Sequence, residues 1–224
     1  MLTRADWTMV SGLVHGFLDR AESRDGDWAG SLATIGVALP VQTPRQVHGV
    51  AVARAPFAGE RPLADAVVTT DPQLAVGIVT ADCVPILLVD RHRRVAVAVH
   101  AGWRGAAGGI LDRAVDYLTC EHANQGARLE AAIGPAIGGC CYEVGDEVYD
   151  AFRSAYGPLT AAAWSRPGAK WHLDLRLAVR LLLAQAGVEH VETLGPCTRC
   201  DIRYHSYRRD GAGAGRQLSF VGWR

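Results

Sequence analysis

Brief apolar runs separated by turn-like connections fill residues 46–100 and predict a succession of strands. The runs ILLVD and VAVAV are almost continuously apolar, which is typical of strands covered on both faces of a sheet. The connections Asp71-Pro72-Gln73 and Asp90-Arg91-His92-Arg93 are short and rich in turn-forming residues. We therefore expect strands over residues 46–54, 66–70, 75–79, 85–90 and 94–100.

Apolar residues recur at helical spacing in the second half of the chain. Within residues 105–118 they are Ile110, Leu111, Ala114, Val115 and Leu118. The leucine-rich run 173–186 ends at Gly187, a typical helix stop. A further helix is expected over 144–156, and strands are expected over 129–133, 190–194 and 217–223. This order predicts an α/β (mixed α+β) fold in which helices flank a buried mixed β-sheet.

Length and composition fit one globular domain spanning residues 1–224. Apolar residues make up 49% of the chain, and 23 basic residues balance 23 acidic ones, so charge gives no reason to expect nucleic acid or a membrane surface as partner. The chain carries no signal-like start and no apolar run of about 18 residues, which predicts a cytoplasmic protein. A core of this size does not require disulfides, so we expect reduced cysteines, and a monomer is the default.

Three polar segments interrupt the apolar pattern at predicted strand ends: RQVHG at 45–49, ADCVP at 81–85 and HAGWRG at 100–105. Strand ends that face a common loop layer are where sheet-based enzymes collect reactive side chains. The imidazoles of His48 and His100 and the thiolate of Cys83 suit zinc, and also copper, and leave one coordination position open for catalysis. The spacing of these residues leaves two alternatives open. Cys83 could be a small core residue, and His100 could be a hydrogen-bonded histidine at the end of a strand.

Several motifs resemble, in order, those of the YfiH-like proteins, also labelled laccase-domain or multicopper polyphenol oxidase domain proteins. They are QVHG, ADAVVTT, TADCVPILL, HAGWRG, AIGPAIGGCCYEVG and SYRRDGAGAGRQLSFVGW, and they extend from about Gln46 to Trp223. The part before residue 45 departs from the family pattern. Where members usually carry a Ser-Leu-Asn-Leu-Gly stretch within a longer segment, this chain has only SLATIG at 31–36.

The resemblance implies a fold similar to that of the cytotoxic necrotizing factor toxins, with zinc held by His48, Cys83 and His100. It also implies purine nucleoside phosphorylase chemistry on adenosine, inosine, guanosine or methylthioadenosine, together with deamination of adenosine to inosine. Zn²⁺ is thus the expected cofactor, with Cu²⁺ as a possible substitute. Purine nucleosides and phosphate are the expected small-molecule partners.

The expected chemistry assigns roles to residues near the ligands. An open-site zinc lowers the pKa of a bound water to about 7, which suits deamination. Phosphorolysis also needs an anion site, which Arg45 and Arg104 could supply unless they are solvated surface residues. Asp82 could move a proton or orient a ligand imidazole, or it could cap a turn. Trp103 and Tyr142 could stack on a purine or simply pack. The catalytic candidates are Cys83, His100, Asp82 and Arg45, and the substrate-binding candidates are Arg104, Gln46, Tyr142 and Arg208.

Other chemistries compete for the same residues. A four-copper oxidase needs many histidines, typically as His-x-His pairs, and this chain has eight histidines and no such pair. Copper in the three-ligand site could still give weak polyphenol oxidase (laccase) activity. A metal-free Cys-His hydrolase would use Cys83 as nucleophile and His100 as base, for an amide or for a peptidoglycan precursor carrying the wrong amino acid. A metal-holding binding module is the non-enzymatic alternative.

The other cysteines and the C-terminal arginines are less specific. Cys197-Thr198-Arg199-Cys200 has CxxC spacing, but zinc would need a second pair, which Cys140-Cys141 could supply. Small, partly buried thiols near the mouth of the site are the interpretation that we favour. Arg208 and Arg209 could bind substrate or anchor the C-terminal turn by salt bridges, and the sequence favours anchoring.

Overall fold

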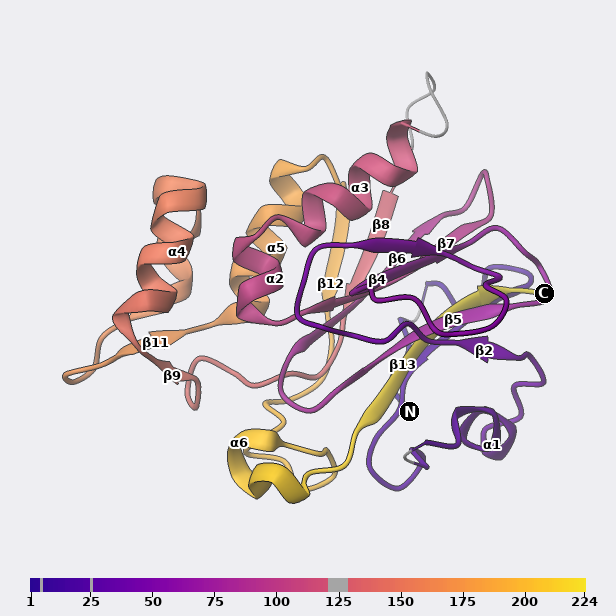
Figure 1. Cartoon of the computed structure of the whole chain (residues 1–224), viewed down its shortest axis with the longest axis horizontal. Coiled ribbons are helices and arrows are strands. Elements are labelled where there is room, and N and C mark those ends of the chain that lie inside the picture. Colours follow the sequence, from indigo (N-terminus) through magenta and orange to yellow (C-terminus); the bar gives the residue numbers. More distant parts are fainter. Residues whose placement is uncertain (5, 25, 121–128) are drawn as a thin grey trace.

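A six-stranded mixed sheet forms the centre of the molecule (Figure 1). The computed structural model describes residues 1–4, 6–24, 26–120 and 129–224. The strand order is β12-β8-β6-β7-β4-β3, with parallel pairing of β3 with β4 and of β8 with β12, and antiparallel pairing elsewhere. The strands are β3 (Val52–Arg54), β4 (Ala66–Thr69), β6 (Val84–Asp90), β7 (Val95–Ala101), β8 (Leu129–Ile133) and β12 (His190–Thr193).

A four-stranded sheet of order β1-β13-β5-β2 covers one face of the six-stranded sheet (Figure 1). Its strands are β1 (Leu13–Phe17), β2 (Val41–Gln42), β5 (Ala75–Thr80) and β13 (Gln217–Trp223). Leu87 and Val89 of β6 share a buried cluster with Ile78 of β5 and Val221 of β13. Successive side chains of a strand point to opposite faces, so these residues form the contact between the two sheets.

Helices cover the opposite face, where Ile86 and Leu88 of β6 point. They are α2 (Trp103–Ala107), α3 (Ile110–Cys120) and α5 (Leu175–Gln185). Ile110 and Leu111 of α3 and Leu182 of α5 are buried in the same cluster. Both faces of β6 and β7 are therefore covered, which explains why their sequences are almost continuously apolar.

The remaining elements lie around this layered core. A three-stranded sheet of order β10-β11-β9 and helix α4 lie at one end of the molecule, at the left of Figure 1. These elements and the adjoining 3₁₀ helix are β9 (Glu143–Val144), β10 (Trp164–Ser165), β11 (Trp171–Leu173), α4 (Asp146–Tyr156) and η1 (Gly157–Ala163). The short helices α1 (Trp28–Thr34), α6 (Tyr207–Asp210) and η2 (Gly211–Gly213) complete the described elements.

The predicted mixed α+β fold is confirmed, and so are the strands predicted from residue 66 onward. The strand predicted over 46–54 is wrong for its first half, because His48 has φ +60° and only Val52–Arg54 is extended in a sheet. The helix predicted over 105–118 is two helices, since Gly109 has φ +89° between α2 and α3. The segment before residue 45, for which no element was predicted, contains β1, α1 and β2.

The helix predictions over 144–156 and 173–186 are confirmed except at their first residues. Val144 belongs to β9, so α4 starts at Asp146. The Asp174 carboxylate accepts from Leu177 N and caps α5, which begins at Leu175.

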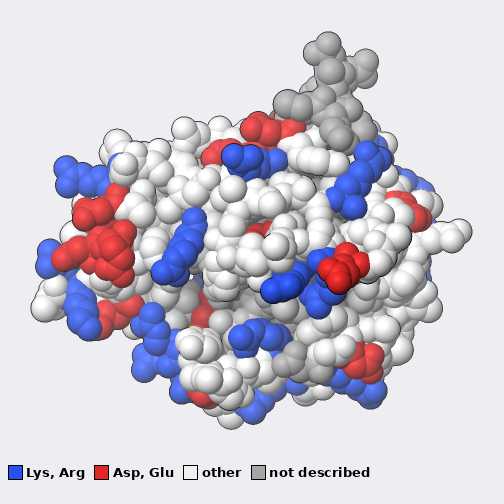
Figure 2. Space-filling model, in the orientation of Figure 1, with Lys and Arg blue, Asp and Glu red and all other residues white. Residues whose placement is uncertain are grey.

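Basic and acidic side chains are interspersed over the face shown in Figure 2. None of the helices in the described part of the chain is both long and apolar enough to cross a membrane.

Candidate metal centre and substrate pocket

Asp65 fixes the turn that carries His48. The Asp65 side chain is fully buried just before β4, and its carboxylate accepts from the backbone N–H groups of Val47 (3.2 Å), His48 (2.9 Å) and Gly49 (2.7 Å). These three bonds hold residues 47–49 in a turn in which His48 has a left-handed backbone, and they direct its imidazole toward Cys83. Residues 47–49 therefore form a turn that carries the candidate ligand His48, and not a strand.

The same carboxylate orients His100. His100 lies in β7, is 3% exposed, and has its Nδ1 2.8 Å from Asp65 Oδ1. With Nδ1 bonded to the carboxylate, Nε2 is the ring nitrogen that remains for a ligand. Burial alone would lower the pKa of His100, but the hydrogen bonds with Asp65 and Cys83 outweigh it and raise this pKa to about 9. Burial opposes ionisation of Asp65 too, yet the bonds from His100 and from the amides of Gly49 and Val47 keep its pKa below 3.8.

Cys83 completes the triad at the start of β6. It follows Asp82, whose φ of +88° turns the chain just before the strand begins. Cys83 Sγ lies 3.8 Å from His48 Nε2, and the rings of His48 and His100 meet edge to face with centroids 4.8 Å apart. Burial raises the pKa of the Cys83 thiol, but hydrogen bonds from His100 and His48 outweigh it and lower the pKa to about 6.

This triad fits a metal ion with an open coordination position. The three ligand atoms lie within 4.8 Å of one another, and one sulfur with two imidazole nitrogens is a donor set that zinc accepts. Gly102 borders the site closely, because a Cβ there would lie 2.9 Å from His48 Cδ2 and 3.3 Å from Cys83 Sγ. A side chain at position 102 would therefore press on two of the three ligands.

A cavity of about 610 Å³ opens at the triad, a size ordinary for a small-molecule site. Its lining includes the three candidate ligands and the aromatic rings of Trp103, Tyr142 and Tyr207. Five arginines also line it, namely Arg45, Arg61, Arg104, Arg208 and Arg216. The lining is thus strongly basic, as an anion site requires.

The pocket arginines differ in how they are held. Arg61 donates to the carbonyls of Thr43 and Pro44, whereas the Arg45 guanidinium has no hydrogen-bond or ion-pair partner among the described residues. The Arg104 guanidinium lies 4.3 Å from the centroid of the Trp103 ring. Arg45 and Arg104 are both exposed, so their donors are accessible to a ligand.

Arg208 lies beside Tyr142 in the lining of the pocket. Its guanidinium donates to Glu143 O and lies 5.2 Å from the centroid of the Tyr142 ring. Burial raises the pKa of Tyr142 above its ordinary value, so this phenol is neutral. The pair presents an aromatic ring and a cation to the cavity.

Asp82 lines the pocket but uses its carboxylate to hold the C-terminal segment. It accepts from Thr198 Oγ1 (2.6 Å), Ser206 Oγ (3.0 Å) and Arg208 N (2.6 Å). Asp82 thus joins the start of β6 to the loop after β12 and to the first turn of α6. The carboxylate that contacts a ligand imidazole is Asp65, not Asp82.

Two further candidates have structural partners. Both amide atoms of Gln46 bond to the backbone of Val79 at 2.8 Å, which fixes the ligand turn to β5. Arg209 donates to the carbonyls of Thr198 and Tyr204 and pairs with Asp210, so it anchors the C-terminal turn as expected.

Asp65 and Gly102 are the site residues that sequence reasoning missed. Asp65 stands within the motif ADAVVTT, and a lone carboxylate entering a buried strand was the signal that could have identified it. Gly102 stands beside His100 in HAGWRG, where only a small residue fits the contact.

Comparison with known proteins places this chain in a family. The sequence model described as "Multi-copper polyphenol oxidoreductase laccase" matches residues 22–224. The chain is 40% identical over 192 residues to adenosine deaminase RL5 of an unknown prokaryotic organism, covering 80% of this chain and 73% of the relative. It is 43% identical over 182 residues to a purine nucleoside phosphorylase of Deinococcus radiodurans, covering 79% and 68% of the two chains. With purine nucleoside phosphorylase YlmD of Geobacillus stearothermophilus the sequence match is 40% over 174 residues, covering 75% of this chain and 63% of that protein.

Solved structures agree. The crystal structure of YlmD from Geobacillus stearothermophilus superposes with a TM-score of 0.82 at 30% identity, covering 96% of this chain and 93% of that one. A Bacillus licheniformis hypothetical protein YfiH gives a TM-score of 0.83 at 26% identity, covering 95% and 93%. With its motifs, its fold and the match over residues 22–224 in agreement, the chain belongs to the multi-copper polyphenol oxidoreductase laccase family of YfiH-like proteins.

Proposed function

We propose that this chain is a zinc-dependent purine nucleoside phosphorylase that also deaminates adenosine. The observation that carries the proposal is the triad of His48, Cys83 and His100 in the lining of a cavity of about 610 Å³ that also includes five arginines. Relatives named purine nucleoside phosphorylase and adenosine deaminase, at 40–43% identity, support the choice of substrate. We include inosine, guanosine and methylthioadenosine among the substrates.

Three side chains would hold the metal, and a neighbouring carboxylate would position them. His48 and His100 would bind through imidazole nitrogen and Cys83 through sulfur, while Asp65 keeps His100 in the tautomer whose Nε2 is free to bind. When bound, a zinc ion with an open coordination position supplies Lewis-acid activation of water or of a substrate oxygen. Cu²⁺ would suit the same donors.

The pocket residues would bind the two substrates. In phosphorolysis, a phosphate oxygen forms a bond to the ribose C1′ while the bond from C1′ to the purine nitrogen breaks. Arg45 and Arg104 hold the phosphate by charge-assisted hydrogen bonds, because their guanidinium groups are exposed at the cavity. Tyr142 and Trp103 offer ring faces to the purine, and Asp82 keeps Arg208 in place through its backbone N–H.

The chain would act as one unit in the cytoplasm. Strands β6 and β7 contribute to the cores on both faces of the central sheet, which supports one cooperative domain over residues 1–224. The proposed metal site needs Cys83 as a thiolate, which suits a reducing compartment.

The direct test incubates zinc-loaded protein with inosine or adenosine, with and without phosphate, and separates the products by chromatography. Phosphate-dependent release of hypoxanthine from inosine, and formation of inosine from adenosine, are expected, and His48→Ala should abolish both. Arg113→Gln, an exposed change on α3, serves as the matched control and should retain both activities. The proposal fails if neither nucleoside changes while a phenol is oxidised in proportion to bound copper.

A Cys-His hydrolase is the second candidate, favoured by the contact of Cys83 Sγ with His48 Nε2 at 3.8 Å. Hydrogen bonds from His100 and His48 overcome the effect of burial and lower the pKa of the Cys83 thiol to about 6, which is what a thiolate nucleophile requires. Metal content separates the two candidates. Zinc-free protein that alkylates rapidly at Cys83 and turns over an amide would support the hydrolase, whereas protection of Cys83 by stoichiometric zinc supports the phosphorylase.

A further inference from the structure

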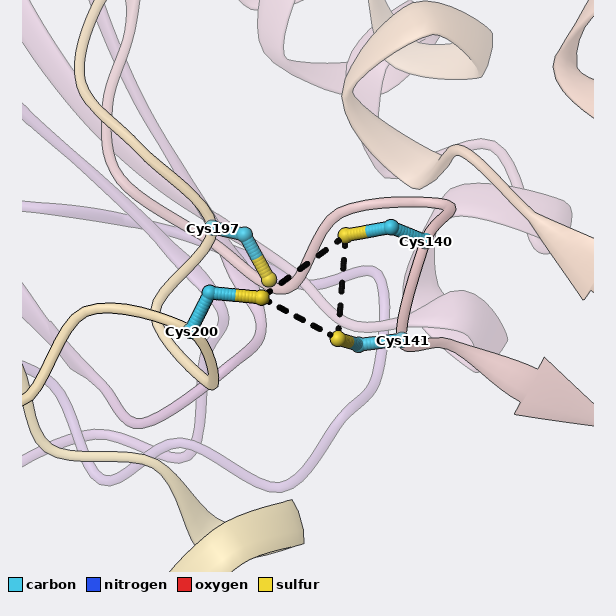
Figure 3. A group of neighbouring side chains, drawn as sticks. All are labelled: Cys140, Cys141, Cys197 and Cys200. Atoms are coloured by element: carbon cyan, nitrogen blue, oxygen red, sulfur yellow. Dashed lines mark hydrogen bonds between the residues drawn. The ribbon is translucent and has the colours of Figure 1, made fainter.

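Four cysteines from two distant loops gather beside the substrate pocket (Figure 3). Cys140 and Cys141 lie between β8 and β9, and Cys197 and Cys200 lie in the loop that follows β12. Their sulfur atoms all lie within 4.8 Å of one another. The favoured interpretation from the sequence, separate small thiols, does not account for this convergence.

The sulfur separations match a tetrahedral metal site. Four sulfurs at the ordinary zinc–sulfur distance of about 2.3 Å stand about 3.8 Å apart along each edge of the tetrahedron. The observed contacts are 3.3 Å for Cys141–Cys200, 3.6 Å for Cys140–Cys141 and 4.0 Å for Cys140–Cys200. A single disulfide would leave two of the four thiols without a function, whereas one ion uses all four.

The backbone around Cys197 is arranged to stabilise a thiolate. Cys197 is buried, and its sulfur accepts a hydrogen bond from Gly138 N at 3.2 Å. Asp201 N and Cys200 N both donate to Cys197 O, which closes the CxxC segment into a tight turn. A Cβ on Gly138 would lie 3.3 Å from Cys197 Cβ and 3.4 Å from Cys140 Sγ, so the glycine allows both loops to approach. Donated N–H···S bonds and a small residue at the contact suit thiolates packed around one cation.

We propose that Cys140, Cys141, Cys197 and Cys200 bind a second zinc ion, which acts as a structural cross-link between the two loops. A site with four protein ligands is closed, so it has no position for substrate. The four thiols lose their protons on binding, and no oxidant is needed. The cross-link does not depend on the nucleoside chemistry proposed for the triad.

The cross-link would hold one wall of the pocket. Tyr142, next to Cys141, lines the cavity. Thr198, within the CxxC segment, donates its hydroxyl to Asp82, the neighbour of Cys83. Removing the ion would therefore loosen Tyr142 and Asp82 together, although none of the four cysteines lines the cavity. The expected kinetic result is a raised nucleoside KM with a smaller change in kcat.

Metal analysis of the purified full chain tests the proposal. We expect two zinc ions per chain in the wild type, one in His48→Ala, one in Cys200→Ser, and none in the double variant. Cobalt-loaded His48→Ala should show the intense charge-transfer and visible bands of a tetrahedral tetrathiolate. This arm leaves the cluster unmutated, so a cysteine variant that fails to fold does not block the test.

The metal content of the His48→Ala protein can also overturn the proposal. Absence of bound zinc in that variant after purification under reducing conditions, together with failure to take up cobalt, would overturn it. Detection of a stable Cys141–Cys200 disulfide by mass spectrometry, with no metal at the cluster, would overturn it as well. Retention of both zinc ions in Cys200→Ser would do the same.

Discussion

Replacing Asp65 with Asn should weaken metal binding and the fold together, because one buried carboxylate serves both. Its Oδ1 faces His48 N and His100 Nδ1, and its Oδ2 faces the N–H groups of Val47 and Gly49. All four partners are donors when His100 carries its proton on Nδ1. Asn has nearly the same shape but replaces one acceptor oxygen with an NH₂ group, which is itself a donor.

The magnitude follows from this geometry. Whichever way the substituted amide is turned, two donors lose their acceptor. An unsatisfied buried donor costs about 1–3 kcal/mol, and the turn amides are only part-buried, so unfolding free energy should fall by at most about 2–6 kcal/mol. His100 can relieve the conflict by moving its proton to Nε2, but that nitrogen is then blocked for metal. Loss of such an orienting partner weakens metal affinity by about 10–100-fold, equivalent to about 1.4–2.8 kcal/mol.

Two assays check these numbers. Urea unfolding of the metal-free protein gives the stability change, and zinc competition with a chelator gives the affinity. Asp90→Asn is the matched control. Asp90 is also buried, and one of its carboxylate oxygens accepts hydrogen bonds from two backbone amides. It lies far from the triad, at the opposite end of β6 from Cys83. Equal zinc affinity in Asp65→Asn and Asp90→Asn would refute the role assigned to Asp65.

Three further changes test other parts of the structure. Gly102→Ala should displace the His48 ring and weaken zinc binding about tenfold, because the new Cβ would lie 2.9 Å from His48 Cδ2. Chelator competition measures the zinc affinity, and an unchanged affinity would show that this contact does not constrain His48. Arg45→Gln should raise the KM for phosphate about tenfold or more, with little effect on the KM for inosine, and an equal effect on both would argue against an anion role. Burial lowers the pKa of His15 from 6.5 to about 4, so the fold holds a neutral imidazole. The contribution of neutral His15 to the free energy of unfolding is fully present above pH 6.5, and about 3 kcal/mol of it is lost as the pH falls from 6.5 toward 4. Urea unfolding at several pH values measures this loss, and His15→Gln should remove it. Equal pH profiles for the wild type and the variant would contradict the prediction.

The sequence predicted the parts of the fold whose cause is local. The segments 129–133 and 217–223 form β8 and β13 with the predicted bounds; their residues are mostly apolar and all are buried, as covered strands require. The helix over 105–118 was predicted as one, although the apolar residues that carry its helical spacing, from Ile110 onward, all follow Gly109. The left-handed backbone of Gly109 ends α2, and periodicity alone does not report it.

The remaining errors have a non-local cause. Residues 47–49 form a turn and not a strand because Asp65, distant in sequence, accepts their three amides. The two cysteine pairs likewise meet only because the loop after β8 and the loop after β12 leave neighbouring strands of one sheet. Polar residues at predicted strand ends suggested the three candidate ligands and the family resemblance implied them, but the Asp65 carboxylate that contacts both histidines is brought there by strand pairing, which the sequence does not encode locally.

Anomalous diffraction from zinc-loaded crystals would locate the metal and show whether His48, Cys83 and His100 bind it. Data collected on either side of the zinc absorption edge should give a peak within bonding distance of His48 Nε2, Cys83 Sγ and His100 Nε2. Crystals of zinc-loaded, catalytically active protein that show no anomalous peak among these three atoms would contradict the account.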